Sequence, residues 1–212
     1  MAEETSPGCQ RPDLRRLKTG PTRPESKVPR FESGVDSPVR VLSIDPALRN
    51  TGYAVLEQIL ESGRKPVYRS LTYGVISNKR GLRQSTCLVS IRESLNEVIQ
   101  EYRPEVCAVE GVIFVQSFKT AITMGAARGA AIIAAAEHGL EIFEYAPRRV
   151  KQAVVGRGSA DKQQVAFMIR ALLQLRETPP SDAADALAIG MAHLYETDPT
   201  RVSGAVEKSA PL

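Results

Sequence analysis

Residues 41–45 read VLSID and residues 106–110 read VCAVE, and each apolar run stops at a carboxylate. Apolar runs of this length are typical of strands that are buried on both faces of a parallel sheet. A carboxylate is costly to bury unless it is paired or binds a metal ion. Asp45 and Glu110, which end the two runs, are therefore candidates for one shared site.

The pattern around these two runs predicts an α/β domain. Three strand-like runs, at 39–45, 51–58 and 67–76, are joined by short turn-rich segments, which favours an antiparallel meander. The chain then predicts, in order, a helix at 82–102, a strand at 105–112, an Ala-rich helix at about 118–138, a strand at 141–147 and further helices broken at 156–158 and 179–180. Because a strand–helix–strand unit implies parallel pairing, the first strand is expected to lie beside the strand of Glu110.

Composition sets the domain organisation. A chain of 212 residues, 42% of them hydrophobic, suits one domain with its own core and some additional tail. Residues 1–38 hold six prolines and an excess of basic residues, and they are predicted to be a disordered extension. We expect a folded domain at 39–197 and a flexible tail at 198–212.

Several classes of protein are disfavoured. No apolar stretch approaches the roughly 20 residues of a membrane helix, and MAEETSPG at 1–8 lacks the features of a signal peptide, so a cytoplasmic protein without membrane contact is expected. The three cysteines are widely spaced and form no CxxC, which disfavours disulfides and thiolate metal sites. A net charge of +4 permits a polyanionic partner without requiring one.

A third acidic element lies in SDAADALAIG at 181–190. Asp182 and Asp185 are three residues apart, so on a helix they share one face. The alternative is purely structural, because acids in a first helical turn are stabilised by the helix dipole. Together with Asp45 and Glu110, however, the pair suggests one cluster of carboxylates without histidine or cysteine, which favours a hard cation such as Mg²⁺ or Mn²⁺.

Four segments carry a resemblance to a known family. They are DPALRNTGYAV, EGVIFVQSFKTAITMGAARGAAI, FEYAPRRVKQAVVGRGSADKQQVAFMI and SDAADALAIGMAHLY. In order and spacing they resemble the RuvC family of Holliday-junction resolvases, over about 39–195. The resemblance implies an RNase H-like fold, with a five-stranded mixed sheet of order 3-2-1-4-5 flanked by helices. It also implies Mg²⁺-dependent paired nicks in four-way junction DNA, made by a homodimer in recombination and repair.

The resemblance implies that Asp45, Glu110, Asp182 and Asp185 are the catalytic carboxylates and the metal ligands. Two Mg²⁺ ions per active site are expected, with Mn²⁺ as a possible substitute. In phosphodiester hydrolysis, two ions ~3.5–4 Å apart can activate the attacking water and stabilise the leaving oxygen. Asp45 is the expected bridging ligand, because the first strand is central in this fold.

The resemblance further implies basic residues on the side that faces DNA. Lys151 and Lys162 stand where the family has functional lysines, and Arg148, Arg149 and Arg157 add positive charge around them. A lysine near an active site can stabilise developing charge on a phosphate. For any one of these residues, the alternative is a solvated surface charge.

The sequence departs from the family after the second acid. The family commonly has an aromatic residue three positions on and an asparagine seven positions on, where this chain has Ile113 and Ser117. Phe114 and Phe118 stand one place later, so a neighbouring aromatic residue could supply the base contact, or the contact could be apolar. Phe114 and Ser117 are the expected DNA contacts of this segment. A base stacked on an aromatic ring is worth ~1–3 kcal/mol, so the change could alter junction preference without affecting the metal site.

The helix at 118–138 is rich in Ala and Gly, and it is expected both to pack against the sheet and to form the dimer contact that the family uses. The family also implies a branch-migration motor, of the RuvA and RuvB type, as a partner. Two other functions remain open from the sequence. One is another RNase H-like nuclease that acts on structured RNA, and the other is a junction-binding protein without catalysis.

Overall fold

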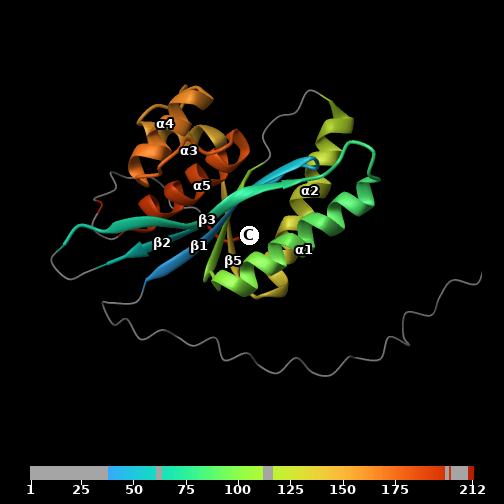
Figure 1. Ribbon diagram of the computed structural model, residues 1–212, viewed down its shortest axis with the longest axis horizontal. Coiled ribbons are helices and arrows are strands. Elements are labelled where there is room, and N and C mark those ends of the chain that lie inside the picture. Colours follow the sequence, from blue (N-terminus) through green and yellow to red (C-terminus); the bar gives the residue numbers. More distant parts are fainter. Residues whose placement is uncertain (1–37, 61–63, 112–116, 199–200, 202–209) are drawn as a thin grey trace, which may run out of the picture. The chain divides into compact units, whose positions relative to one another are not determined.

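Five strands form one mixed sheet in the computed structural model, which describes residues 38–60, 64–111, 117–198, 201 and 210–212 (Figure 1). The strands are β1 (Val39–Asp45), β2 (Asn50–Ile59), β3 (Val67–Ser77), β4 (Val106–Glu110) and β5 (Glu141–Tyr145). Their order is β3-β2-β1-β4-β5, with β2 antiparallel to β1 and β3, and with β1, β4 and β5 parallel. The predicted order and the central place of the first strand are confirmed.

Helices cover both faces of the sheet (Figure 1). One face carries α1 (Gln84–Tyr102) and α2 (Phe118–Glu137), and the other carries α3 (Pro147–Val155), α4 (Lys162–Leu172) and α5 (Ser181–Thr197). The two faces therefore have separate apolar cores. Each core combines inward-facing strand residues with the apolar stripe of its helices.

The small residues of α2 and α5 allow close packing. On α2, the buried residues are Ala127, Ala130, Ala131, Ala134 and Ala135. These alanines share one apolar core with residues of β1, β4 and β5, which confirms the predicted packing of this helix against the sheet. On α5, an unbroken run from Ala186 to Leu194 is buried, because this helix lies against β1 and β2 while α3 and α4 cover its other side.

One strand boundary differs from the sequence prediction. The strand predicted at 141–147 ends at Tyr145, and Pro147 instead begins α3, since proline fits the first helical position, where the backbone N–H has no helical partner. Most of the predicted tail at 198–212 lies outside the described residues, but two of its described residues make contacts. Asp198 accepts a hydrogen bond of 2.5 Å from the Tyr68 hydroxyl, and the Leu212 N–H donates to the Ile142 carbonyl at 2.8 Å.

The described cysteines are core residues. Cys87 and Cys107 are free and buried, and burial raises the pKa of Cys107 to about 12, which keeps it an unreactive core thiol. Within the part of the chain that the structure describes, no helix has the length and apolar character to span a bilayer.

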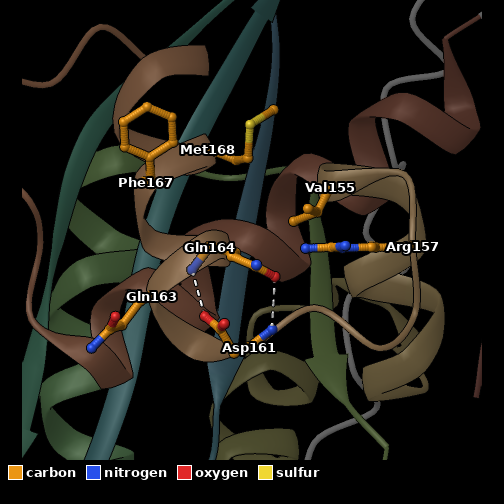
Figure 2. A pocket seen from close by; sticks show the side chains of 7 residues that line it. All are labelled: Val155, Arg157, Asp161, Gln163, Gln164, Phe167 and Met168. Atoms are coloured by element: carbon orange, nitrogen blue, oxygen red, sulfur yellow. Dashed lines mark hydrogen bonds between the residues drawn. The ribbon is translucent and has the colours of Figure 1, made fainter.

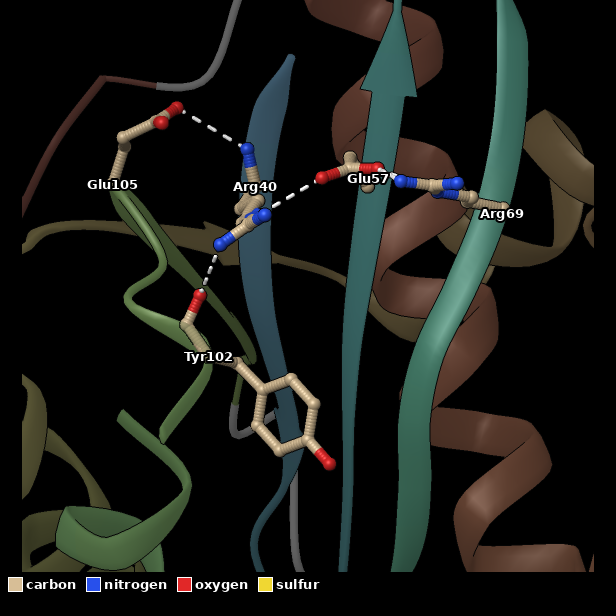
Figure 3. Close-up of polar contacts among 5 residues, drawn as sticks. All are labelled: Arg40, Glu57, Arg69, Tyr102 and Glu105. Carbon is tan, nitrogen blue, oxygen red and sulfur yellow. Dashed lines mark hydrogen bonds and ion pairs between the residues drawn. The ribbon is translucent and has the colours of Figure 1, made fainter. Parts of the chain in front are cut away.

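A fully buried carboxylate ties three strands together at the end of β1 opposite Asp45 (Figure 3). Glu57 on β2 accepts a hydrogen bond of 2.9 Å from Arg40 on β1 and one of 2.5 Å from Arg69 on β3. Arg40 also donates to the Tyr102 carbonyl at 3.0 Å, at the end of α1. Burial by itself raises the pKa of Glu57, but the two guanidinium groups outweigh it and hold this pKa below its usual value.

Replacing Glu57 with Gln is expected to destabilise the domain by about 1–3 kcal/mol, because two charge-assisted hydrogen bonds lose their acceptor charge. Since the pKa is lowered in the folded state, the stabilisation is present above the unfolded pKa and disappears as the pH falls through the folded pKa. Chemical denaturation should therefore show a smaller difference in unfolding free energy between wild type and Glu57→Gln at low pH than at pH 7. Glu137→Gln, in an exposed ion pair with Arg92, is the matched control, and an equal loss in both variants would contradict the special role of the buried pair.

Candidate active site

Asp45 and Glu110 end neighbouring strands at the same edge of the sheet. The parallel register pairs Ile44 of β1 with Val109 of β4, so the acids that follow these residues stand side by side. Their side chains are partly buried and share a hydrogen bond. The pairing that the sequence predicted is therefore present, at the carboxyl edge where open α/β sheets place their sites.

Burial and nearby negative charge disfavour the charged form of both carboxyl groups, although the hydrogen bond with Asp45 lowers the pKa of Glu110. Burial, the charge of Glu110 and the charge of Asp185 raise the pKa of Asp45 to about 8. Burial likewise raises the pKa of Glu110, with a further contribution from Asp185. At neutral pH the pair therefore retains a proton that one carboxyl group donates to the other, which is the expected response of two close acids without a cation.

The N-terminal part of α5, with Asp182 in its first turn, brings Asp182 and Asp185 to this edge. The negative charge of Asp185 raises the pKa of both strand-end acids, so Asp185 lies near the same centre. Gly52 on β2 is paired with Asp45 in the sheet and lies directly under α5. A methyl group at Gly52 would overlap the backbone carbonyl of Asp182, so only glycine permits this approach of helix and strand.

Lys162 begins α4 and reaches into the acidic cluster. Its ammonium group donates a hydrogen bond of 2.7 Å to Asp185, and it also interacts with the charges of Asp45 and Asp182. The bond to Asp185 raises the pKa of Lys162, so this lysine stays protonated at neutral pH. Lys151 on α3 lies close enough to Glu110 to lower its pKa. Both lysines named from the sequence therefore stand beside the acids.

The donor set fits a hard cation. Four carboxylates offer only oxygen ligands, and their mutual repulsion is relieved by positive charge. Across the described residues, however, no three acidic, histidine or cysteine side chains already stand in an arrangement that could hold a metal ion. In this arrangement Asp45 shares a hydrogen bond with Glu110, and Asp185 accepts one from Lys162, so these contacts engage oxygens that a cation would need. Loss of the proton between Asp45 and Glu110 and movement of the exposed Lys162 side chain would free the carboxylate oxygens for a cation.

The three arginines named from the sequence have different surroundings. Arg149 forms an ion pair of 2.8 Å with Glu196 and lies near the Tyr145 ring, so it holds α3 against α5. Arg148 is exposed and packs its side chain against Gly158.

Arg157 is also exposed, and it lines an open hollow of about 680 Å³ beside α4 (Figure 2). This hollow includes Asp161 and Phe167 but none of the four carboxylates. Arg157 is therefore apart from the acidic cluster, at a position where it can add positive charge to the surface beside it.

Ser117 and Phe114 were the remaining predicted DNA contacts. Ser117 is the N-cap of α2, where its hydroxyl accepts a hydrogen bond from the Thr120 N–H at 3.5 Å. Phe114, together with Ile113, lies outside the described residues. The next aromatic residue, Phe118, begins α2 with 91% of its surface exposed.

Sequence reasoning missed the residues that position the acids. Gly52 was part of a predicted strand. The only signal of its role was its residue type, because a glycine inside a strand often marks the close approach of another segment. Thr51 was missed as well. Its hydroxyl donates to the Ala47 carbonyl at 2.6 Å and accepts from the Ala47 N–H at 3.3 Å, which fixes the turn after Asp45.

Comparisons with known proteins agree with this geometry. The family model described as "Crossover junction endodeoxyribonuclease RuvC" matches residues 41–193. A protein of that name from Akkermansia muciniphila is 57% identical over 163 residues, which cover 77% of this chain and 95% of the relative. Another, from Caldanaerobacter subterraneus, is 40% identical over 161 residues, or 76% of this chain and 94% of the relative.

A solved structure gives the same result. The structure "T. thermophilus RuvC in complex with Holliday junction substrate" has a TM-score of 0.71 and 32% sequence identity. The match covers 82% of this chain and 99% of the T. thermophilus chain. The sequence matches, the structural match and the acids at the carboxyl edge of the sheet all agree. This chain belongs to the RuvC family of crossover junction endodeoxyribonucleases.

Proposed function

We propose that this protein resolves four-way (Holliday) DNA junctions by paired, symmetric nicks, as a metal-dependent endonuclease of recombination and DNA repair. The observation that carries this proposal is the Asp45–Glu110 pair at the sheet edge, facing Asp185 and Lys162. A T. thermophilus member of the family has been solved with a Holliday junction substrate, which supports the same substrate here.

We propose Asp45, Glu110, Asp182 and Asp185 as the metal ligands, with Asp45 in the bridging position because β1 is the central strand. When bound, two Mg²⁺ ions, or Mn²⁺ in their place, supply Lewis-acid activation of the attacking water and charge neutralisation at the leaving 3′ oxygen. The chain's own part is to hold the carboxylates at this edge. Protonated Lys162 cannot accept a proton, so its proposed role is to turn from Asp185 toward the scissile phosphate and stabilise charge there.

We further propose that Lys151, Arg148 and Arg157 contact the DNA backbone around the site. Arg149 contributes less, because it is already engaged with Glu196. Phe114 and Ser117 remain proposed contacts to the junction, although Ser117 also caps α2.

A homodimer is proposed through the open face of α2. Phe118 and Ile122 are 91% and 70% exposed, and Ile133 lies further along the same face. Between them Gly125 and Gly129 leave this face open, with no atom of the described residues within 4 Å of an added methyl group. A second copy seated there would relate two active sites by a twofold axis, which suits paired cuts. A motor of the RuvA and RuvB type remains a prediction from the family, and a cytoplasmic location remains a prediction from the sequence.

A comparison of substrates tests the reaction. The full chain is incubated with Mg²⁺ or Mn²⁺ and, in parallel, a mobile four-way DNA junction, a linear duplex of the same sequence and a structured RNA. We expect symmetric nicks in the junction and little cutting of the other two. Preferred cutting of the RNA would favour the alternative RNase H-like nuclease. Junction binding without cutting at any junction sequence would favour a non-catalytic binding protein.

The metal requirement should depend on pH. Because the pKa of Asp45 is raised to about 8, metal binding at pH 6 must release a proton, whereas at pH 8.5 most of that proton has already left. We therefore expect the Mg²⁺ concentration for half-maximal thermal stabilisation to fall as the pH rises from 6 to 8.5. Equal midpoints at both pH values would contradict the assignment of Asp45 as a ligand.

A further inference from the structure

An ion pair outside the four carboxylates lies against the residue that follows Glu110. Arg128 on α2 and Glu144 on β5 form this pair, and both side chains are partly buried. Glu144 is opposite Val109 in the β4–β5 ladder, one residue before Glu110. The pair therefore connects α2 to the end of the strand that carries a proposed metal ligand.

The contact on the strand end is close. A methyl group built on Gly111 would lie 2.6 Å from Glu144 Oε1 and 3.0 Å from its Cγ, so the Glu144 side chain fills the space that a side chain at Gly111 would need. The Gly111 N–H also donates to the Tyr145 carbonyl at 2.9 Å. Backbone and side chain of β5 thus hold Gly111 from two directions, and the position of Glu110 depends on both.

The pair also stabilises a partly buried charge at this strand end. Glu144 is paired with Val109, so it lies on the α2 face of the sheet, opposite the face to which Glu110 points, and without Arg128 it would be a carboxylate without a counter-charge there. Arg128 is held in place although its Nε is buried without a hydrogen-bond partner among the described residues, and such an unpaired donor costs about 1–3 kcal/mol. A need for packing alone would be met at lower cost by an apolar side chain.

We propose that Arg128 and Glu144 are positioning residues that hold Gly111, and with it Glu110, in register for metal binding. This inference rests on the proposed role of Glu110 as a ligand. Partners behind a ligand typically change metal affinity or activity by about 10- to 100-fold when they are removed. Neither residue is proposed to touch substrate or metal.

The test uses the full chain and two readouts, the thermal stabilisation by Mg²⁺ and single-turnover cleavage of a four-way junction. Arg128→Gln is expected to raise the Mg²⁺ concentration for half-maximal stabilisation by about 10-fold, with slower cleavage and unchanged junction binding without Mg²⁺. Adding Glu144→Gln should recover much of this loss, because a neutral amide pair keeps a hydrogen bond and removes the unpaired carboxylate. Arg92→Gln, which breaks the exposed pair with Glu137 between α1 and α2, is the matched control and should leave both readouts unchanged.

A second variant keeps the inference testable if Arg128→Gln does not fold. Glu144→Ala removes the contact with Gly111 without leaving a buried carboxylate, and it should also raise the Mg²⁺ midpoint. Midpoints equal to that of Arg92→Gln in the folded variants would overturn the inference. Glu110→Gln distinguishes a failure of the ligand assignment from a failure of the positioning role. If Glu110→Gln binds Mg²⁺ and cuts like wild type, the ligand assignment fails. If Glu110→Gln is inactive while Arg128 and Glu144 variants match the control, only the positioning role fails.

Discussion

Replacing Asp45 with Asn is expected to abolish cleavage of a four-way junction while junction binding persists. Asn keeps the size of the side chain but removes the charge that a bridging ligand must supply. Metal ions contribute several kcal/mol of transition-state stabilisation, so loss of about 4 kcal/mol corresponds to a decrease of about 10³-fold in the cleavage rate. Single-turnover cleavage with saturating enzyme measures the rate, and a gel-shift assay without Mg²⁺ measures binding.

The same variant should be more stable than wild type when no metal is present. Because the folded pKa of Asp45 is about 8 against a usual 3.8, the unfolded chain loses this proton at lower pH than the folded chain does. The native state therefore loses stability as the pH rises between these values, and Asn removes that loss. For a domain of this size, each 1 kcal/mol raises Tm by about 2–4 °C.

Added Mg²⁺ should make wild type more stable than Asp45→Asn, since it stabilises wild type by binding and has little effect on the variant. Cleavage by Asp45→Asn within tenfold of wild type would rule out Asp45 as a bridging ligand. A variant that unfolds at lower temperature and no longer binds junction DNA would instead indicate a structural role.

The sequence predicted the sheet and the acidic cluster because both depend on local patterns. VLSID and VCAVE are each long enough to be recognised as buried strands, and their terminal acids follow from strand pairing alone. The order of the remaining strands came from the resemblance to a family, since periodicity does not specify which strands become neighbours. The end of β5 shows the limit of such patterns: residues 146–147 continue the extended pattern in sequence, but the backbone of Pro147 suits the first turn of a helix.

The supporting contacts could not be predicted because each joins segments far apart in the chain. Gly52 meets the carbonyl of Asp182, which is 130 residues later, and no periodicity relates the two positions. Glu57 has the place of a buried apolar residue in β2, and only the arrival of Arg40 and Arg69 from the neighbouring strands makes its charge stable there. Such contacts depend on the relative placement of elements, which the fold determines and the local sequence does not.

Replacing Gly52 with Ala is therefore expected to reduce cleavage strongly although Gly52 touches neither metal nor DNA. The added methyl group would overlap backbone atoms of Asp182, which cannot rotate away as a flexible side chain can. The first turn of α5 must then move, and Asp182 and Asp185 move with it. A displacement of about 1 Å can cost about 10²-fold in rate, and overpacking typically costs about 1–3 kcal/mol of stability.

Gly81→Ala is the matched control. Gly81 is exposed and does not have a positive φ, and no atom of the described residues, apart from its chain neighbours, lies within 4 Å of an added methyl group. Alanine there should therefore change neither cleavage nor Tm. The decisive measurement is cleavage as a function of Mg²⁺ at a temperature where Gly52→Ala is fully folded. A raised Mg²⁺ midpoint together with a lower maximal rate is expected, because two ligands have shifted. If Gly52→Ala cuts like Gly81→Ala under these conditions, the contact between β2 and α5 does not set the position of the acids, and the cluster must tolerate movement of that helix.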